Sequence, residues 1–234
     1  MSAVVNAVAV VNRSELADAE VAIIVEAYRA EVGRFCAAWG LPVPGLAVYG
    51  RNHQQAVDEE AAVIFTDSTD VPDAYGYHTA LGVAYWGYVD VGLCQADGEP
   101  VSRVFGHELW ELLADAPADA WVGPFPDGSH VAKEVSDPVA RKSRTREVDD
   151  PVLGKGEAEI ADYVLPAWFD PMAQAGTWSD QGAAPGPLED APGGYHTTEK
   201  AGGVVAGPSA RVRSYGRTMR RLLNPPSQGE PTAV

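Results

Sequence analysis

The chain has 234 residues, of which 46% are apolar, and a formal net charge of −16. This length suits one domain with an appendage, and the apolar fraction suffices for a buried core. Because 33 acidic residues outnumber 17 basic ones, the charge argues against a nucleic-acid partner. The apolar N-terminus has no basic leading segment and no apolar run is as long as a membrane span, so we expect neither a signal peptide nor a transmembrane segment.

The first part of the chain predicts a long helix followed by short strands. Residues 14–39 place apolar side chains at helical spacing, with Ser14 as the N-cap and Gly40 just beyond the helix. The later apolar runs are short, which is typical of strands. Strands are expected at residues 46–49, 61–66 and 131–135, with one or two more in 83–93.

A second helix is predicted at Val101–Ala114, and it carries the most informative residues. It contains the run His107-Glu108-Leu109-Trp110-Glu111. Residues in a helix advance by about 100° each, so His107, Glu111 and Asp115 lie along one face. In the usual zinc helix, HExxH, two histidines four residues apart bind the metal and the glutamate between them is the general base. Here the spacing is kept, but Glu111 stands where the second histidine would be.

This replacement changes the expected metal chemistry. Two neutral histidines and one carboxylate leave a Zn²⁺ site with a net positive charge, which polarises water. With His107, Glu111 and a second carboxylate, that charge is formally cancelled, so the ion would be a weaker Lewis acid. Zn²⁺ is the first expectation for the cation, although oxygen-rich ligation also favours Mn²⁺ or Ca²⁺. Metal binding tolerates this change better than fast hydrolysis does.

Further ligands are expected after this helix. Glu134 is the expected third ligand. Asp137, three residues later, is expected either to orient a ligand side chain by a hydrogen bond or to bind the metal itself. His130 and Asp115 are alternative ligands. The first is a nearby nitrogen donor, and the second shares the helical face of His107.

Two further residues complete the predicted site. Glu108 is the expected general base, which would take a proton from the attacking water. His78 follows Gly76-Tyr77 at the expected start of a strand, where it would bind substrate or metal, or donate a structural hydrogen bond to a loop carbonyl. The alternative for the whole pattern is a solvated acidic helix face, which is common on protein surfaces.

The composition changes near residue 183, where Gly, Pro and Ala begin to dominate. Residues 1–182 are therefore predicted to form one domain, and residues 183–234 an extended arm with little core of its own. The arm is expected to dock on an acidic surface, such as another copy of the chain, through a short basic stretch: Arg211, Arg213, Arg217, Arg220 and Arg221.

The order of these elements resembles that of the zincin metallopeptidases, in which a backing helix and a twisted sheet precede the metal helix. The resemblance covers about residues 14–137 by organisation and His107–Glu111 by motif. It implies an α/β (α+β) domain with a mixed twisted sheet, a backing helix and a metal-site helix, here followed by the C-terminal arm. In that family the last strand before the metal helix lines the substrate cleft.

A closer resemblance is to a group of proteins from tailed bacteriophages and prophages. The turn after the helix departs from that group, because Ala116 separates Asp115 from Pro117. The resemblance implies a phage or prophage setting, in the virion or the host cytoplasm, and not an activity. The shared elements are Gly76-Tyr77-His78, His107–Glu111 with Asp115, Glu134–Pro138, Pro166–Phe169 and Gly193-Gly194-Tyr195.

Two functions follow from these patterns. The first is a metal-dependent hydrolase, most simply a zincin-like metallopeptidase, in which His107, Glu111 and Glu134 hold the cation and Glu108 is the base. The second is a phage virion protein, structural or interacting, on the same scaffold with a degenerate or structural metal site. The expected partners are a protein or peptide, including phage capsid or tail proteins, or a second copy bound through the arm.

Overall fold

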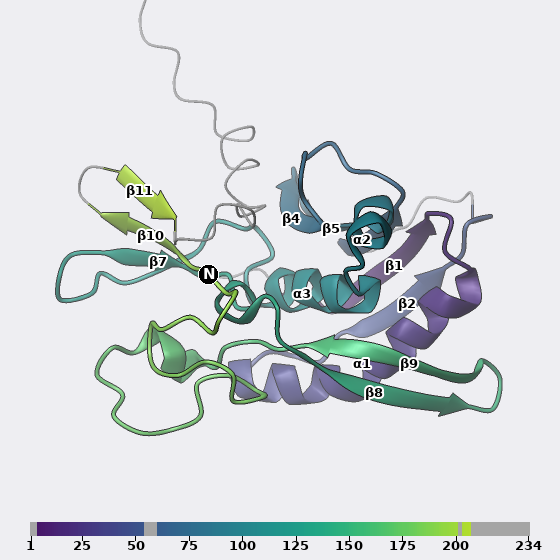
Figure 1. The fold of residues 1–234 in the computed structure, drawn as a ribbon. Helices are drawn as coiled ribbons and strands as arrows, with labels where there is room; N and C mark the ends of the chain where they lie inside the picture. The colour runs from purple at the N-terminus through teal and green to yellow at the C-terminus, as the bar shows by residue number, and fades with distance from the viewer. Residues whose placement is uncertain (1–3, 54–59, 201–202, 207–234) are drawn as a thin grey trace, which may run out of the picture.

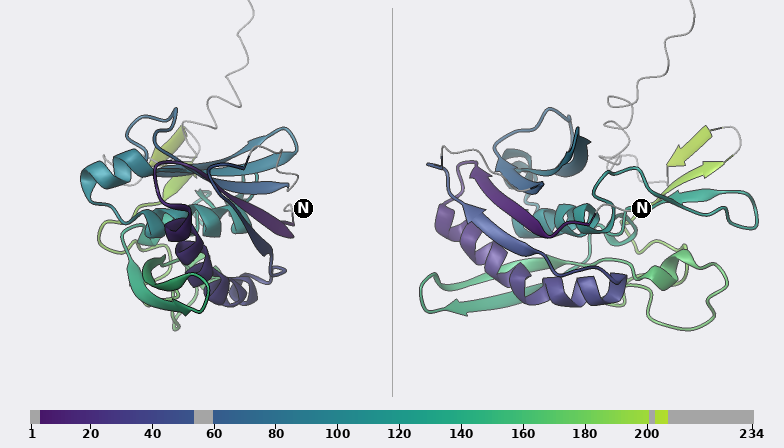
Figure 2. Two further views of the ribbon diagram at one scale, coloured as in Figure 1. Left: turned by 90° about the vertical axis from the view of Figure 1, so that its right-hand side faces the viewer. Right: turned by 180° about the vertical axis from the view of Figure 1, so that it is seen from behind.

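The computed structural model describes residues 4–53, 60–200 and 203–206, and these residues form a mixed α/β fold (Figure 1). Two long helices lie between a five-stranded sheet and a two-stranded hairpin (Figures 1 and 2). The elements in chain order are β1 Ala7–Arg13, α1 Asp18–Trp39, β2 Gly45–Tyr49, β3 Ala61–Thr66, β4 Gly76–Leu81, β5 Ala84–Asp90, α2 Val91–Asp97, α3 Val101–Ala114, β6 Trp121–Val122, β7 His130–Ala132, η1 Asp137–Val139, β8 Ser143–Asp150, β9 Gly154–Ala161, η2 Pro166–Phe169, β10 Thr197–Lys200 and β11 Gly203–Ala206.

The main sheet is mixed, with strand order β2-β1-β3-β5-β4. Strands β1, β2, β3 and β5 are parallel, while β4 runs antiparallel to β5 at the edge. The two residues Gly82 and Val83 connect β4 to β5, and Gly82 has a φ of 67°, which favours glycine. The hairpin fixes the register of β4, so that His78 pairs with Gly87.

The first helix begins later than the sequence pattern predicts. Helix α1 starts at Asp18, and its N-cap, Ala17, makes no side-chain cap hydrogen bond. The prediction of Ser14 as the N-cap is wrong, because the Ser14 hydroxyl donates instead to the Asn12 side-chain oxygen, 2.8 Å away, at the end of β1. The C-terminal end is as predicted: Gly40 adopts a left-handed conformation and its N–H donates to the carbonyl of Cys36.

The two long helices are joined to the hairpin β8–β9 through buried aromatic residues. The Tyr28 hydroxyl on α1 donates to the Glu159 carbonyl (2.9 Å) and accepts from the Ala161 N–H (2.8 Å). The indole of Trp110 on α3 donates to the carbonyl of Ala161 (3.1 Å). Because Tyr28 and Trp110 are also in ring contact, the two helices and strand β9 form one packed unit.

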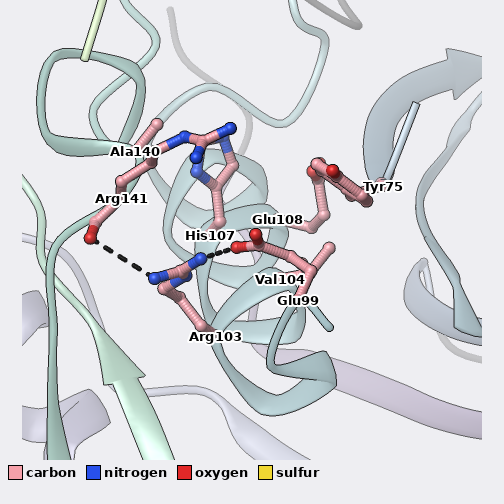
Figure 3. A pocket seen from close by; sticks show the side chains of 9 residues that line it. Tyr75, Glu99, Arg103, Val104, His107, Glu108, Ala140 and Arg141 are labelled. Atoms are coloured by element: carbon pink, nitrogen blue, oxygen red, sulfur yellow. Dashed lines mark hydrogen bonds and ion pairs between the residues drawn. The ribbon is translucent and has the colours of Figure 1, made fainter. Parts of the chain in front are cut away.

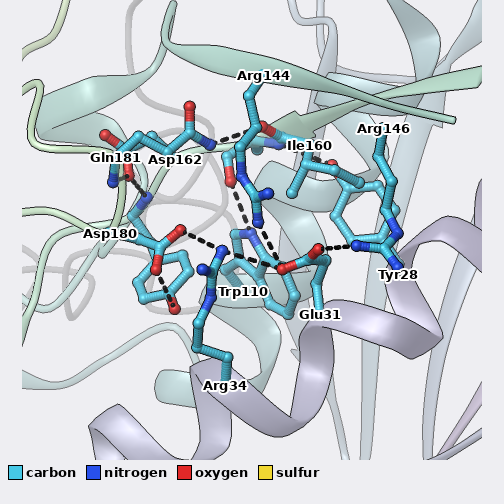
Figure 4. A network of polar contacts seen from close by, with 12 residues as sticks. Tyr28, Glu31, Arg34, Trp110, Arg144, Arg146, Ile160, Asp162, Asp180 and Gln181 are labelled. Carbon is cyan, nitrogen blue, oxygen red and sulfur yellow. Dashed lines mark hydrogen bonds and ion pairs between the residues drawn. The ribbon is translucent and has the colours of Figure 1, made fainter.

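A charged network links α1 to the other strand of the hairpin, β8 (Figure 4). Glu31 of α1 is buried, and its carboxylate accepts from Arg144 (2.5 Å) and Arg146 (2.6 Å) of β8. Arg34, one turn further along α1, bridges Glu31 and Asp180 at 3.0 and 2.8 Å. These guanidinium groups remain partly exposed, so the network links α1 to β8 without burying several charges.

The first residues of the predicted arm pack onto the domain. Strand β10 pairs with β7 in a second sheet of order β11-β10-β7-β6. The backbone N–H of Tyr195 donates to the carbonyl of Asp137 (3.0 Å), and Tyr195 is buried. Gly194 lies so close to the Pro138 carbonyl that no Cβ would fit there. The basic stretch from Arg211 to Arg221 lies outside the described residues.

Some helices and strands lie where the sequence predicts them, and others were not predicted. Helix α3 and strand β3 have the predicted bounds, whereas β1, the short helix α2 and the hairpin β8–β9 were not predicted. Within the part of the chain that the structure describes, no helix has both the length and the apolar character needed to cross a bilayer.

Candidate metal centre

Six acidic and histidine side chains converge between the edge strand β4 and helix α3, and all six are buried. Helix α3 is buried on almost its whole circumference, so the acidic face predicted from its sequence is not a solvated surface. We call this set the Glu111 cluster. It consists of His78 on β4, His107, Glu108 and Glu111 on α3, Glu134 after β7, and Asp137 at the start of η1.

Within the cluster, two groups of three residues have the chemistry and the spacing of a metal site. Each has one histidine and two carboxylates, whose ligand atoms all lie within 4.8 Å of one another. The His107 group contains His107, Glu111 and Asp137. The His78 group contains His78, Glu111 and Glu134. Glu111 belongs to both groups, and all five residues are buried.

The His107 group is the tighter of the two. The His107 ring Nε2 lies 3.2 Å from Glu111 Oε1 and 3.3 Å from Asp137 Oδ1. Despite these short distances, Nε2 makes no hydrogen bond to any residue that the structure describes. Donor atoms around a tetrahedral Zn²⁺ with bonds of about 2.0–2.1 Å lie roughly 3.4 Å apart, so the spacing suits a shared cation.

The His78 group is looser and is oriented by a backbone carbonyl. His78 Nδ1 lies 3.6 Å from Glu111 Oε2, and Nε2 lies 3.1 Å from the carbonyl oxygen of Asp115. When Nε2 donates its proton to that carbonyl, Nδ1 presents its lone pair to the cluster, which is the arrangement usual for metal-binding histidines. Glu134 Oε2 lies 3.8 Å from the other ring nitrogen, Nε2.

Glu108 is buried beside both groups but belongs to neither. Only 1% of the residue is exposed, and its Oε2 makes no hydrogen bond among the described residues. The His78 Nδ1 lies 3.9 Å from that oxygen. On the side facing the sheet, Gly76 lies so close to the Glu108 carboxylate that a Cβ would clash with it. Glu108 is therefore held in position by packing, with one oxygen available to a further group.

The crowding of these groups shifts their ionisation. Burial raises the pKa of Glu108 well above its usual range, and the Glu111 carboxylate adds to this rise against the opposing effect of His107. Burial alone would lower the pKa of His78, but the carboxylates of Glu134, Glu111 and Glu108 raise it to about 10. Burial and Glu111 raise the pKa of Asp137 to about 6. A carboxyl group with a raised pKa is suited to exchanging protons near neutral pH.

The predicted site residues divide into those inside and those outside the cluster. His107, Glu108, Glu111, Glu134, Asp137 and His78 all lie in it. The alternative ligands do not contribute side chains: Asp115 Oδ2 accepts from the Ala120 N–H (2.8 Å), and His130 belongs to neither metal group. Asp115 takes part through its carbonyl, which sequence reasoning missed because a backbone contact to His78 leaves no signal in the sequence.

A pocket borders the cluster at His107 and Glu108 (Figure 3). His107 and Glu108 form part of its wall, as do the two cationic side chains Arg103 and Arg141. Arg103 pairs with Glu99 and donates to the carbonyl of Arg141 (3.3 Å). The remaining lining residues are Tyr75, Gly76, Glu99, Val104 and Ala140.

The donor set fits a divalent cation. Among the described residues, His107 Nε2 and Glu108 Oε2 are buried without a hydrogen bond. Burying such polar atoms carries a large desolvation cost, which a bound cation would offset. Imidazole nitrogens with carboxylate oxygens suit Zn²⁺, and the carboxylate excess also admits Mn²⁺. These buried residues could therefore hold a cation. The predicted third ligand, Glu134, is grouped with His78, and it is Asp137 that is grouped with His107 and Glu111.

No protein-family model matches this chain, and neither a curated protein nor a solved structure was found to match it. The function must therefore be argued from the Glu111 cluster and its surroundings.

Proposed function

We propose that this chain is a metal-dependent hydrolase, most simply a zincin-like metallopeptidase, whose cation binds at the Glu111 cluster. The observation that carries the proposal is the burial of Glu108 beside two histidine–carboxylate groups, with no hydrogen bond to its Oε2 from any described residue. The chain order of backing helix α1, mixed sheet and site helix α3 supports the zincin-like layout that the sequence resembles.

Each residue of the cluster has a distinct role in this proposal. His107, Glu111 and Asp137 bind the cation, and His78 with Glu134 completes the ligand set on the other side of Glu111. When bound, the cation would polarise a substrate carbonyl and make water more acidic. Glu108, whose Oε2 makes no hydrogen bond among the described residues, accepts the proton of the attacking water and delivers it to the leaving amine.

Substrate would enter through the pocket beside His107 and Glu108 (Figure 3). The rest of the cluster is closed: His78 is 1% exposed and Glu111 is 4% exposed. This burial would strengthen the electrostatic interactions between a bound cation, Glu108 and the substrate carbonyl.

The proposal is tested with the full chain purified without chelator. Cleavage of a diverse peptide mixture is followed by mass spectrometry, and bound metal is measured in the same sample. We expect bound metal and cleavage in the wild type, and a Glu108→Gln variant that keeps its metal but cleaves about 10²–10⁴-fold more slowly. Glu147→Gln on the exposed face of β8 is the matched control and should cleave like the wild type.

A result that contradicts the proposal is a Glu108→Gln variant with full activity, or wild-type protein without bound metal. Metal bound without any cleavage would instead favour the second candidate, a structural or interacting protein of a phage virion. The near-complete burial of the Glu111 cluster supports that candidate, because ions in structural sites are closed to substrate.

A further inference from the structure

We propose that the Glu111 cluster binds two divalent cations, one in the His107 group and one in the His78 group, bridged by the Glu111 carboxylate. This inference deepens the proposed function and rests on it. It differs from the single-ion site expected from the HExxE helix, because it assigns a separate cation to His78 and Glu134.

The geometry of Glu111 carries the inference. Its two oxygens face different histidines: Oε1 lies 3.2 Å from His107 Nε2, and Oε2 lies 3.6 Å from His78 Nδ1. The described residues form two separate three-residue groups around this carboxylate, and not one larger group. A carboxylate with one oxygen in each of two ligand sets is a bridging ligand, as in the two-metal sites of hydrolases.

Each group has its own second carboxylate. Asp137 Oδ1 lies 3.3 Å from His107 Nε2, while Glu134 lies with His78 on the other side of Glu111. Glu134 lies in the loop after β7, and Asp137 begins η1 three residues later. This one segment thus supplies one acid to each histidine, and only Glu111 is shared.

Formal charge also favours two ions over one. The three ligand carboxylates, Glu111, Glu134 and Asp137, carry −3, and the two neutral histidines add nothing. One divalent cation would leave the buried site with a net charge of −1. A negative site would not lower the pKa of a water bound to that cation. Two cations carry +4 and leave the set at +1, with the Glu108 carboxylate beside it. The second ion therefore restores the positive charge that a glutamate in place of the second zinc-helix histidine removes.

An independent observation points to a ligand on the His107 side. His107 Nε2 lies near the Glu111 and Asp137 oxygens, yet forms no hydrogen bond within the part of the chain that the structure describes. On the other side, the Asp115 carbonyl holds the His78 ring with Nδ1 toward Glu111. Because the His78 group is the looser one, we infer that the His107 group binds its ion first and more tightly.

The test uses the full chain stripped with chelator and dialysed to equilibrium against increasing Mn²⁺. Bound metal per chain is measured by elemental analysis, and the saturated protein is examined by electron paramagnetic resonance. We expect two Mn²⁺ per chain, bound in two steps, with a spin-coupled spectrum at saturation. His78→Gln should bind one Mn²⁺ and give an uncoupled spectrum. His130→Gln, a histidine variant outside both groups, should bind two like the wild type.

The outcomes separate this inference from the proposed function. One Mn²⁺ per wild-type chain, unchanged by His78→Gln, overturns the two-ion centre and leaves the single-ion hydrolase standing. Two ions without spin coupling overturn the bridging role of Glu111. No bound Mn²⁺ or Zn²⁺ overturns both proposals. The number of Mn²⁺ ions per wild-type chain and the wild-type spectrum test the two-ion centre even if a variant fails to fold.

Discussion

His78 Nε2 lies 3.1 Å from the backbone carbonyl oxygen of Asp115, so the edge strand β4 is tied directly to the C-terminal end of the site helix α3. This contact joins the two elements that carry His78 and Glu111, although 33 residues separate these two in the sequence. It also leaves His78 Nδ1 directed at the cluster. The arrangement makes the buried Glu111 cluster a part of the fold's core, and a cation bound there would affect stability.

Removing the metal should destabilise the protein. A ligand that binds only the folded state adds about 2.7 kcal/mol at a hundredfold excess over its Kd. Thermal unfolding of metal-loaded protein should therefore occur several degrees above that of chelator-treated protein. In Glu111→Gln the difference between the loaded and the stripped sample should largely disappear, because both ligand groups lose their shared carboxylate. Identical unfolding temperatures for loaded and stripped wild type would contradict the metal centre.

The residue before His107 should tolerate no side chain. A Cβ on Gly106 would overlap the ring and hydroxyl of Tyr28, which holds strand β9 through two hydrogen bonds. We expect Gly106→Ala to lower the free energy of unfolding by about 1–3 kcal/mol or more, the usual cost of overpacking. Urea unfolding monitored by circular dichroism measures this change.

The matched control for that substitution is Gly33→Ala on α1. Gly33 is exposed and a Cβ there would meet no atom within 4 Å. Alanine in an exposed helix interior should raise stability by about 0.5–1 kcal/mol. If Gly106→Ala and Gly33→Ala changed the stability equally, the close packing of Tyr28 against Gly106 would not be the reason for a glycine at position 106.

Arg141 should favour substrates with an anionic group. It is exposed, lines the pocket beside His107 and Glu108, and makes no ion pair among the described residues. We expect Arg141→Gln to raise KM about tenfold for peptides with a carboxylate near the cleaved bond, which corresponds to about 1.4 kcal/mol, with kcat nearly unchanged. Arg13→Gln, at the end of β1 and outside the pocket, is the control. A fall in kcat at constant KM would contradict a binding role.

The buried carboxylate of Glu31 should matter more than an exposed one on the same helix. Glu31→Gln weakens its contacts with Arg144 and Arg146 of β8. Because these arginines are partly exposed and can be rehydrated, we expect a loss of only about 1–2 kcal/mol. Glu26→Gln disrupts an exposed pair with Arg29 and should cost less than about 0.5 kcal/mol. Chemical unfolding of both variants gives the comparison, and equal losses would contradict the structural role of Glu31.

Periodic and local features were the ones that could be predicted from the sequence. Helix α3 has a strong apolar stripe and Pro100 before it, so its predicted bounds are those observed. Strand β3 is a continuous apolar run, which is typical of a central strand. The sequence also identified the acidic and histidine residues of α3 and the acids after it as candidates, because their spacing is a local property.

Features that depend on tertiary contacts could not be predicted in the same way. Strands β8 and β9 are polar on their outer faces and pair mainly with each other, so they lack a continuous apolar run. The assignment of Glu134 to His78, and of Asp137 to His107, depends on how β4 and η1 approach α3. A sequence pattern identifies donor types but not which donors share an ion.

The most direct test of a metal centre at Glu111 is anomalous X-ray scattering at the metal edge, from crystals of the full chain grown with Zn²⁺ or Mn²⁺. We expect anomalous density within the cluster, in the His107 group and in the His78 group, on the two sides of the Glu111 carboxylate. Crystals that show no anomalous density among His78, His107 and Glu111, or show it only at exposed carboxylates, would contradict this expectation.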